Sequence, residues 1–255
     1  MTGSARRRTG DSRYGEGVPL VAAAVCPHPP LLVPEVAGAA APELDDLRAA
    51  CDTAVDRLLA AAPDSVVLLG AGPTTGPIRP PATGSLQPWG VDLDVPLIPG
   101  QPDRGAVLPL SLTIGAWLLT RHGVRPPVTA VQVAADAGPA ELAALAEEIS
   151  SPDARVALLV LGDGSACRGE KAPGYDDQRA RPYDQRVAAA LAGADLDALL
   201  DLDPALSAEL KAAGRAPWQV LAGVARTTGG GWRGELLHDA APYGVAYFVA
   251  SWTPA

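Results

Sequence analysis

Short runs of apolar residues, separated by segments with helical periodicity, constrain the fold of this chain more than any other feature. The four clearest runs cover residues 18–25, 65–69, 128–133 and 155–161. Runs of this length without polar alternation are typical of strands that are buried on both faces. Their alternation with helices predicts an α/β fold, with a mostly parallel or mixed central sheet and helices on both faces.

The segments between and after these runs carry apolar residues at helical spacing. The expected helices cover residues 42–62, 108–122, 139–149, 182–191, 204–213 and 216–225. Residues 232–238 and 243–252 are expected to pair as closing strands. We expect one domain over residues 18–255 and a disordered tail over residues 1–17. The tail is not expected to be a secretory signal, because it contains no apolar stretch of the required kind.

Composition excludes several classes of function. The chain has 255 residues, 48% of them hydrophobic, and a formal net charge of −9, which argues against non-specific binding to nucleic acid or to anionic membranes. No apolar run approaches the roughly 20 residues that span a bilayer. Three cysteines imply no disulfide framework, and a cytoplasmic location is expected.

The most polar segment, residues 161–179, directly follows a predicted buried strand. Ligands in open α/β sheets bind beyond the carboxyl ends of strands, so this segment is the first site candidate. Asp163 is the strongest candidate catalytic residue, followed by Ser165 and Cys167. The alternative role for Asp163 is that of a turn former, through its side chain.

Cationic and hydroxyl groups in the same segment are candidates for binding a small molecule. Arg168, Lys171 and Arg179 offer a grip on a carboxylate or phosphate, and Tyr175 offers a hydrogen-bond donor. The alternative is local ion pairing with the acidic residues of the segment, Glu170, Asp176 and Asp177. A second candidate ligand-binding loop, residues 70–76, contains Gly70 and Gly72, which allow a backbone to approach a ligand closely.

The order of several motifs resembles the class III extradiol ring-cleavage dioxygenases of the catalytic subunit-B type. The chain has Cys-Pro-His-Pro-Pro at residues 26–30, Pro-Asp-Ser-Val-Val at 63–67 and Gly-Asp-Gly-Ser at 162–165. It continues with an expected helix that contains Asp184, then Gly-Arg-Ala-Pro-Trp at 214–218 and Gly-Val-Ala-Tyr at 244–247. The resemblance covers nearly the whole chain from residue 18 onward and implies the same α/β fold.

The resemblance implies a site for Fe(II) held by two histidines and one carboxylate, with a further histidine that handles a proton. His28 matches the first ligand. Residues 69–73 contain no imidazole where the second ligand is expected, and Ala166 occupies the position of the proton-handling histidine. Glu209 is the carboxylate nearest to the third ligand position. The resemblance thus implies Fe(II) or another divalent metal as cofactor, whereas these departures predict that no cofactor binds.

Three hypotheses follow. The first is a diverged homologue that binds a small molecule or acts as a non-catalytic partner. The second is an enzyme with a changed pocket built from His28, Cys26, Asp163 and Cys167, which uses either a metal or a cysteine nucleophile. The third is an assembly subunit, a homo-oligomer for example. Its interface would be lined by tryptophans, chosen from Trp89, Trp117, Trp218, Trp232 and Trp252.

The two remaining histidines are not expected to act as metal ligands. His122 falls in the last turn of an expected helix, where a surface imidazole interacts favourably with the helix dipole. His238 ends a late strand and is expected on the surface or in the core.

Overall fold

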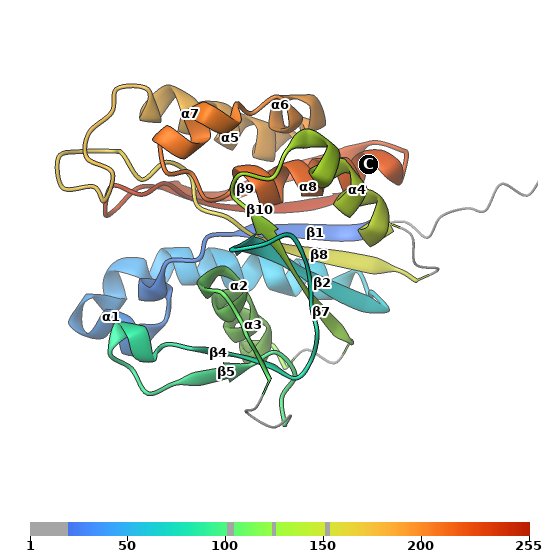
Figure 1. Cartoon of the computed structure of the whole chain (residues 1–255), viewed down its shortest axis with the longest axis horizontal. Helices are drawn as coiled ribbons and strands as arrows, with labels where there is room; N and C mark the ends of the chain where they lie inside the picture. Colours follow the sequence, from blue (N-terminus) through green and yellow to red (C-terminus); the bar gives the residue numbers. More distant parts are fainter. Residues whose placement is uncertain (1–19, 101–104, 124–125, 151–153) are drawn as a thin grey trace, which may run out of the picture.

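A computed structural model describes residues 20–100, 105–123, 126–150 and 154–255, so the expected tail over residues 1–17 lies outside the described part. Seven strands form the central sheet in the order β3-β7-β2-β8-β1-β10-β9 (Figure 1). Their bounds are β1 Leu20–Cys26, β2 Ser65–Gly72, β3 Gly76–Ile78, β7 Val128–Ala134, β8 Val156–Leu161, β9 Trp232–Ala240 and β10 Tyr247–Pro254.

The sheet is mixed, which confirms the predicted fold class. Strands β7, β2, β8 and β1 run parallel to one another, whereas β3, β10 and β9 pair antiparallel at the two sides. Strand β8 is buried throughout, and its alternate side chains enter separate cores on the two faces of the sheet. Burial on both faces explains why the strand sequence is a continuous apolar run.

Helices cover both faces, as Figure 1 shows. One face carries α4 Pro139–Ser150, α5 Ala180–Gly193, α6 Leu196–Leu200, α7 Pro204–Glu209 and α8 Arg215–Thr227. The other carries α1 Pro34–Ala37, α2 Asp45–Ala60 and α3 Leu110–Arg121, with the short 3-10 helices η1 Pro30–Leu32, η2 Gly38–Leu44 and η3 Gln87–Trp89. A small second sheet on this side has the order β5-β4-β6, from β4 Ala82–Ser85, β5 Asp94–Pro96 and β6 Ala106–Val107.

The element bounds differ from the predicted ones where local geometry overrides periodicity. The helix expected from residue 42 begins at Asp45, because the preceding segment forms a 3-10 helix that contains Pro42. The helix expected over residues 204–213 ends at Glu209, since Lys211 adopts a positive φ of 55°. Strands β3, β4 and β6 and helix α6 were not predicted, because each is too short to show a periodic pattern.

The tryptophans are split between the core and the surface. Trp218 and Trp252 are fully buried, which removes them from any interface between subunits, whereas Trp89 is 40% exposed. Among the described helices, none combines the length and apolar character required for crossing a lipid bilayer.

Candidate functional site

The exits of β1 and β8 meet at the carboxyl edge of the sheet, where the sequence placed its strongest site candidates. Cys26 and Leu161 are partners in the parallel register, so the segments that follow them leave the sheet side by side. The backbone N–H of His28 donates to Asp163 Oδ1 over 2.8 Å, and His28 Nδ1 lies 3.6 Å from the same oxygen. The structure thus brings His28 and Asp163 together across 135 residues of sequence.

This His28–Asp163 corner is enclosed. The two side chains are only 10% and 14% exposed. Burial raises the pKa of Asp163 above its ordinary value, although the proximity of His28 partly offsets the effect. Tyr247 of β10 is also buried, and burial together with the nearby Asp163 charge raises its pKa. Among the described residues, His28 Nδ1 has no hydrogen-bond partner.

The donor atoms at this corner do not fit an Fe(II) site of the type that the resemblance implies. Such a site needs three convergent side-chain ligands, and the described residues contain no group of three His, Cys, Asp or Glu side chains able to hold a metal ion. His28 and Asp163 supply two donors. Glu209, the proposed third, lies on the surface at the end of α7, where it accepts a hydrogen bond from Arg179 over 2.6 Å.

Ser165 serves to bind a buried carboxylate. Its hydroxyl donates to Asp184 Oδ2 over 2.6 Å, and its backbone N–H donates to Asp184 Oδ1 over 2.8 Å. Arg168 approaches the same carboxylate, with Nη1 at 3.6 Å from Oδ2. Burial raises the pKa of Asp184, against the effect of the Ser165 hydrogen bonds. Ser165 and Asp184 thus join the loop after β8 to helix α5.

The two cysteines of the second hypothesis lie in different cores. Cys26 packs in the core between the sheet and α2, whereas Cys167 packs in the core on the opposite face. The Cys167 thiol is within 3.5 Å of the carbonyl oxygens of Gly174 and Leu210, and burial raises its pKa, which disfavours a thiolate. The structure therefore places the two thiols of this hypothesis on opposite faces of the sheet.

The remaining candidates of the loop after β8 point to the surface. Arg179 binds Asp177 and Glu209, so the prediction of local ion pairing is confirmed for Arg179 and Asp177. The hydrogen bonds from Arg179 lower the pKa of Asp177 to about 2. Lys171 is exposed, and Tyr175 is 76% exposed. These side chains do not converge with Asp163 on one described cavity.

Gly70 and Gly72 belong to strand β2, which corrects the prediction of a glycine loop starting at residue 70. Both residues continue the parallel register with β7. A Cβ atom on Gly70 would lie 2.6 Å from Ser111 Oγ of α3, and one on Gly72 would clash with Gln132. The missing side chains therefore leave room for Ser111 and Gln132.

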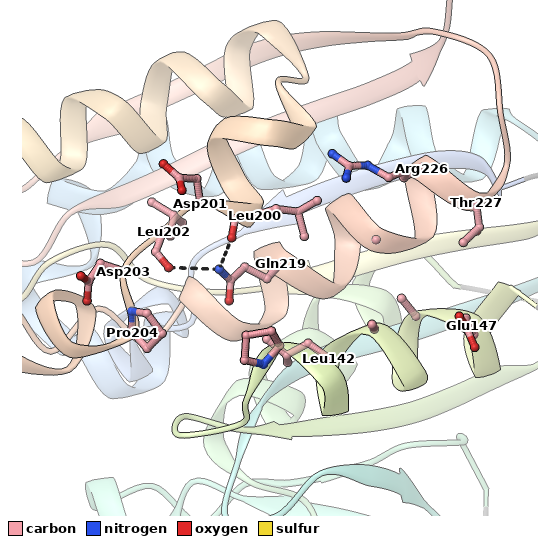
Figure 2. A pocket seen from close by; sticks show the side chains of 14 residues that line it. Leu142, Glu147, Leu200, Asp201, Leu202, Asp203, Pro204, Gln219, Arg226 and Thr227 are labelled. Atoms are coloured by element: carbon pink, nitrogen blue, oxygen red, sulfur yellow. Dashed lines mark hydrogen bonds between the residues drawn. The ribbon is translucent and has the colours of Figure 1, made fainter.

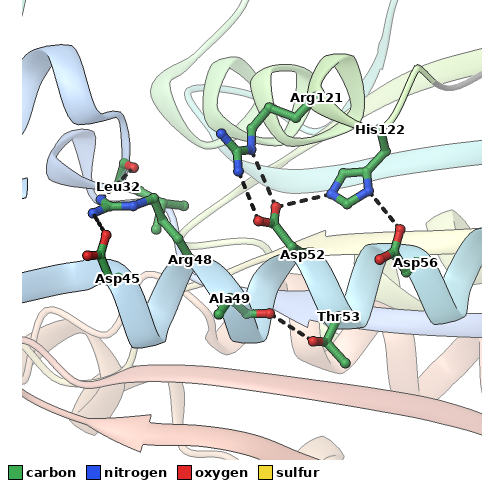
Figure 3. Close-up of polar contacts among 9 residues, drawn as sticks. All are labelled: Leu32, Asp45, Arg48, Ala49, Asp52, Thr53, Asp56, Arg121 and His122. Atoms are coloured by element: carbon green, nitrogen blue, oxygen red, sulfur yellow. Dashed lines mark hydrogen bonds and ion pairs between the residues drawn. The ribbon is translucent and has the colours of Figure 1, made fainter. Parts of the chain in front are cut away.

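His122 forms a polar cluster on the surface between α2 and α3, which Figure 3 shows. Its Nε2 lies 3.1 Å from Asp52 Oδ1 and its Nδ1 lies 2.9 Å from Asp56 Oδ1, while Arg121 Nη2 lies 2.9 Å from Asp52 Oδ2. His122 is the C-cap residue of α3, one position beyond the last turn in which it was expected. Partial burial acts to raise the pKa of Asp52, but the hydrogen bonds from Arg121 and His122 outweigh it and lower that pKa.

His238 is half-buried in β9, and burial lowers its pKa.

A large cavity lies elsewhere, in the helical layer above the sheet (Figure 2). Its volume is about 600 Å³, within the usual range of small-molecule sites. It is bordered by the first three turns of α4, by the connection from α6 to α7 and by one side of α8, and it opens to solvent where Ala143, Asp203 and Arg226 are exposed. The apolar part of its wall includes Pro139, Leu142, Ala143, Leu200, Leu202 and Pro204.

A buried polar network fixes the floor of this cavity. Gln219 Nε2 donates to the carbonyl oxygens of Leu200 and Leu202, over 2.9 and 3.1 Å. Gln219 Oε1 accepts from Arg215 Nη1 over 2.9 Å, and this guanidinium also donates to backbone carbonyls of the loop between β7 and α4. The network ties α8 to both neighbouring connections, so the cavity is preformed.

Sequence reasoning missed this cavity and its network. Gln219 lies in the expected helix over residues 216–225, and Arg215 directly precedes that helix. The two residues are four positions apart, among apolar residues. Two polar side chains on an otherwise apolar helix face were the available signal, because buried polar groups need partners. The partners are backbone carbonyls, which the sequence does not identify.

Comparison with known proteins adds evidence on the fold. No family model matches the chain, and no curated protein matches it. Among solved structures, the chain is similar to the uncharacterized protein JW3007 from Escherichia coli K12, with a TM-score of 0.51 and 14% sequence identity. The match covers 91% of this chain and 99% of the other. The likeness is one of fold.

Proposed function

We propose that this protein is a diverged relative of the class III extradiol dioxygenases that binds a small molecule and does not cleave aromatic rings. The order of motifs from residue 26 to residue 247 supports the kinship. Two donors at the His28–Asp163 corner, where the resemblance implies a set of three, support the loss of iron chemistry.

The observation that carries the proposal is the preformed cavity of about 600 Å³ beside α4 and α8. Cavities of this size with mostly apolar walls and a few fixed polar groups are the usual form of small-molecule sites. Its floor is held by Gln219, so binding requires no rearrangement of the helices. None of the described cavities is lined by His28 or Asp163.

Binding is tested with the neutral dye Nile red, whose emission rises and shifts to the blue in apolar surroundings. The wild-type protein is expected to bind the dye saturably. Ala143→Trp, which fills the cavity from the exposed side of α4, is expected to abolish binding. Ala140→Trp is the matched control, because Ala140 is exposed on the same helix and does not line the cavity. Equal binding by wild type and Ala143→Trp would overturn the assignment to this cavity.

The loss of ring cleavage is tested with the purified protein loaded with Fe(II) without oxygen and then given catechol and dioxygen. Oxygen consumption is expected to match that of a protein-free iron control. Stoichiometric iron in the purified protein, together with catechol cleavage that disappears in His28→Ala, would overturn this part of the proposal.

A further inference from the structure

The charges on the wall of the cavity differ between its two ends. Figure 2 shows Asp203 and Pro204 at one end and Glu147, Arg226 and Thr227 at the other. At the first end the charged lining residues are all acidic, whereas Arg226 brings a cation to the second end.

Existing ion pairs account for some of these charges. Asp201 Oδ2 lies 2.6 Å from Arg186 Nη2, and Arg226 pairs with Asp197. Asp203 forms no ion pair with the described residues. Its Oδ1 accepts the backbone N–H of Leu206 over 2.9 Å as the N-cap of α7, and no described side chain binds its Oδ2. Two carboxylates of the cavity wall, those of Asp203 and Glu147, therefore have no ion pair among the described residues, and Glu147 lies at the end that it shares with Arg226.

Apart from Asp201, the wall beside the Asp203 carboxylate is apolar. Leu200, Leu202 and Pro204 border it, and Leu142 lies across from them on α4. Asp203 is exposed at the rim of the cavity, where its carboxylate attracts a cation and repels an anion. The apolar walls in turn favour a hydrocarbon body.

From this arrangement we infer that the cavity binds an apolar molecule with a single ammonium group, and that Asp203 receives the ammonium. This inference rests on the proposed function, because it names the ligand class of the same cavity. The ammonium donates hydrogen bonds to the carboxylate of Asp203, while the hydrocarbon lies between α4 and the connection from α6 to α7. Such charge-assisted hydrogen bonds are the stronger kind.

The test compares three probes with the same hydrocarbon chain, n-octylammonium, n-octanol and n-octanoate, by isothermal titration calorimetry on the full chain. Octylammonium is expected to bind about tenfold more tightly than octanol, a factor typical of one added charge-assisted hydrogen bond, and octanoate more weakly than either. Ala143→Trp is expected to abolish the binding of octylammonium.

Asp203→Asn isolates the charge of the carboxylate, since asparagine is an equally good N-cap. It is expected to reduce the affinity for octylammonium about tenfold and to leave the affinity for octanol unchanged. Asp195→Asn is the matched control, because Asp195 is the N-cap of α6, accepts the N–H of Ala198 over 3.0 Å and does not line the cavity. The Asp195→Asn variant also measures how much affinity is lost when any one negative charge is removed from a chain with a net charge of −9.

The outcomes separate the two proposals. If octanol and octanoate bind as tightly as octylammonium and Ala143→Trp abolishes all three, the cavity is a binding site but the ammonium class is wrong. If Asp195→Asn weakens octylammonium as much as Asp203→Asn does, the assignment to Asp203 is wrong. If no probe binds and Nile red does not bind either, the proposed function itself fails.

Discussion

The backbone N–H of His28 donates to the side chain of Asp163, with 2.8 Å between nitrogen and oxygen. The Asp163 carboxylate therefore holds the segment that follows β1 against the segment that follows β8. Backbone hydrogen bonds reinforce the junction, since Gly162 donates to the carbonyl of Cys26 and Gly214 donates to the carbonyl of Asp163. The corner that the sequence marks as a reaction site is, in the fold, a tight crossing of three segments.

Replacement of Asp163 is expected to destabilise the protein. Asp163→Ala leaves the buried N–H of His28 without its acceptor, at a cost of about 1–3 kcal/mol in the free energy of unfolding. Asp163→Asn keeps an oxygen acceptor and is expected to recover most of the loss. Urea unfolding followed by circular dichroism measures both, with the exposed Asp176→Ala as control. Equal stability of Asp163→Ala and Asp176→Ala would show that the corner is not held by this bond.

Loss of the Ser165 hydroxyl is expected to weaken the attachment of α5. Ser165→Ala removes the 2.6 Å bond to Asp184 and leaves a buried carboxylate oxygen short of a donor, at about 1–3 kcal/mol. The pKa of Asp184, already raised by burial, is expected to rise further. Thr53→Ala serves as control, since it removes an exposed hydroxyl that binds the carbonyl of Ala49. The idea fails if the two variants unfold at the same urea concentration.

The cluster around Asp52 is expected to contribute stability that depends on pH. Its pKa is lower in the folded protein than the ordinary 3.8, so its contribution is fully present above pH 3.8 and is lost as pH falls through the folded pKa. Asp52→Asn is expected to cost roughly 0.2–1 kcal/mol at neutral pH, the range of exposed ion pairs, and nothing at low pH. Asp46→Asn, on the same helix, provides the control in thermal unfolding at several pH values. A loss that stays constant down to low pH would contradict this account.

The pair of Asp177 and Arg179 gives a direct spectroscopic test of the loop geometry. The carboxyl of Asp177 is expected to titrate at a pKa of about 2, and Arg179→Gln is expected to return it toward 3.8. Carbon-detected NMR of the side-chain carboxyl measures this titration. Lys171→Gln, which removes an exposed cation from the same loop, should leave it unchanged. An unshifted pKa in the wild-type protein would mean that Arg179 does not bind Asp177.

The sequence by itself determined the strands and long helices of the central layers. Strands buried on both faces, such as β8, must be apolar throughout, and amphipathic helices such as α4 must repeat their apolar residues at the helical period. Both requirements concern residues that are close in sequence, so a single sequence is enough to predict them. The pairing of Arg179 with Asp177 was predictable for the same reason, because the two residues are two positions apart.

Only the tertiary structure decided what the polar residues do. Gly70 was expected in a loop, but it lies in strand β2 against Ser111, and Ser165, a candidate catalytic hydroxyl in the sequence, binds Asp184 of helix α5 in the structure. The cavity is set by Gln219 holding carbonyls of two other segments. Contacts between distant segments depend on where the strands and helices are placed. Hydrogen bonds to backbone carbonyls cannot be predicted from residue type, because every residue has a carbonyl group.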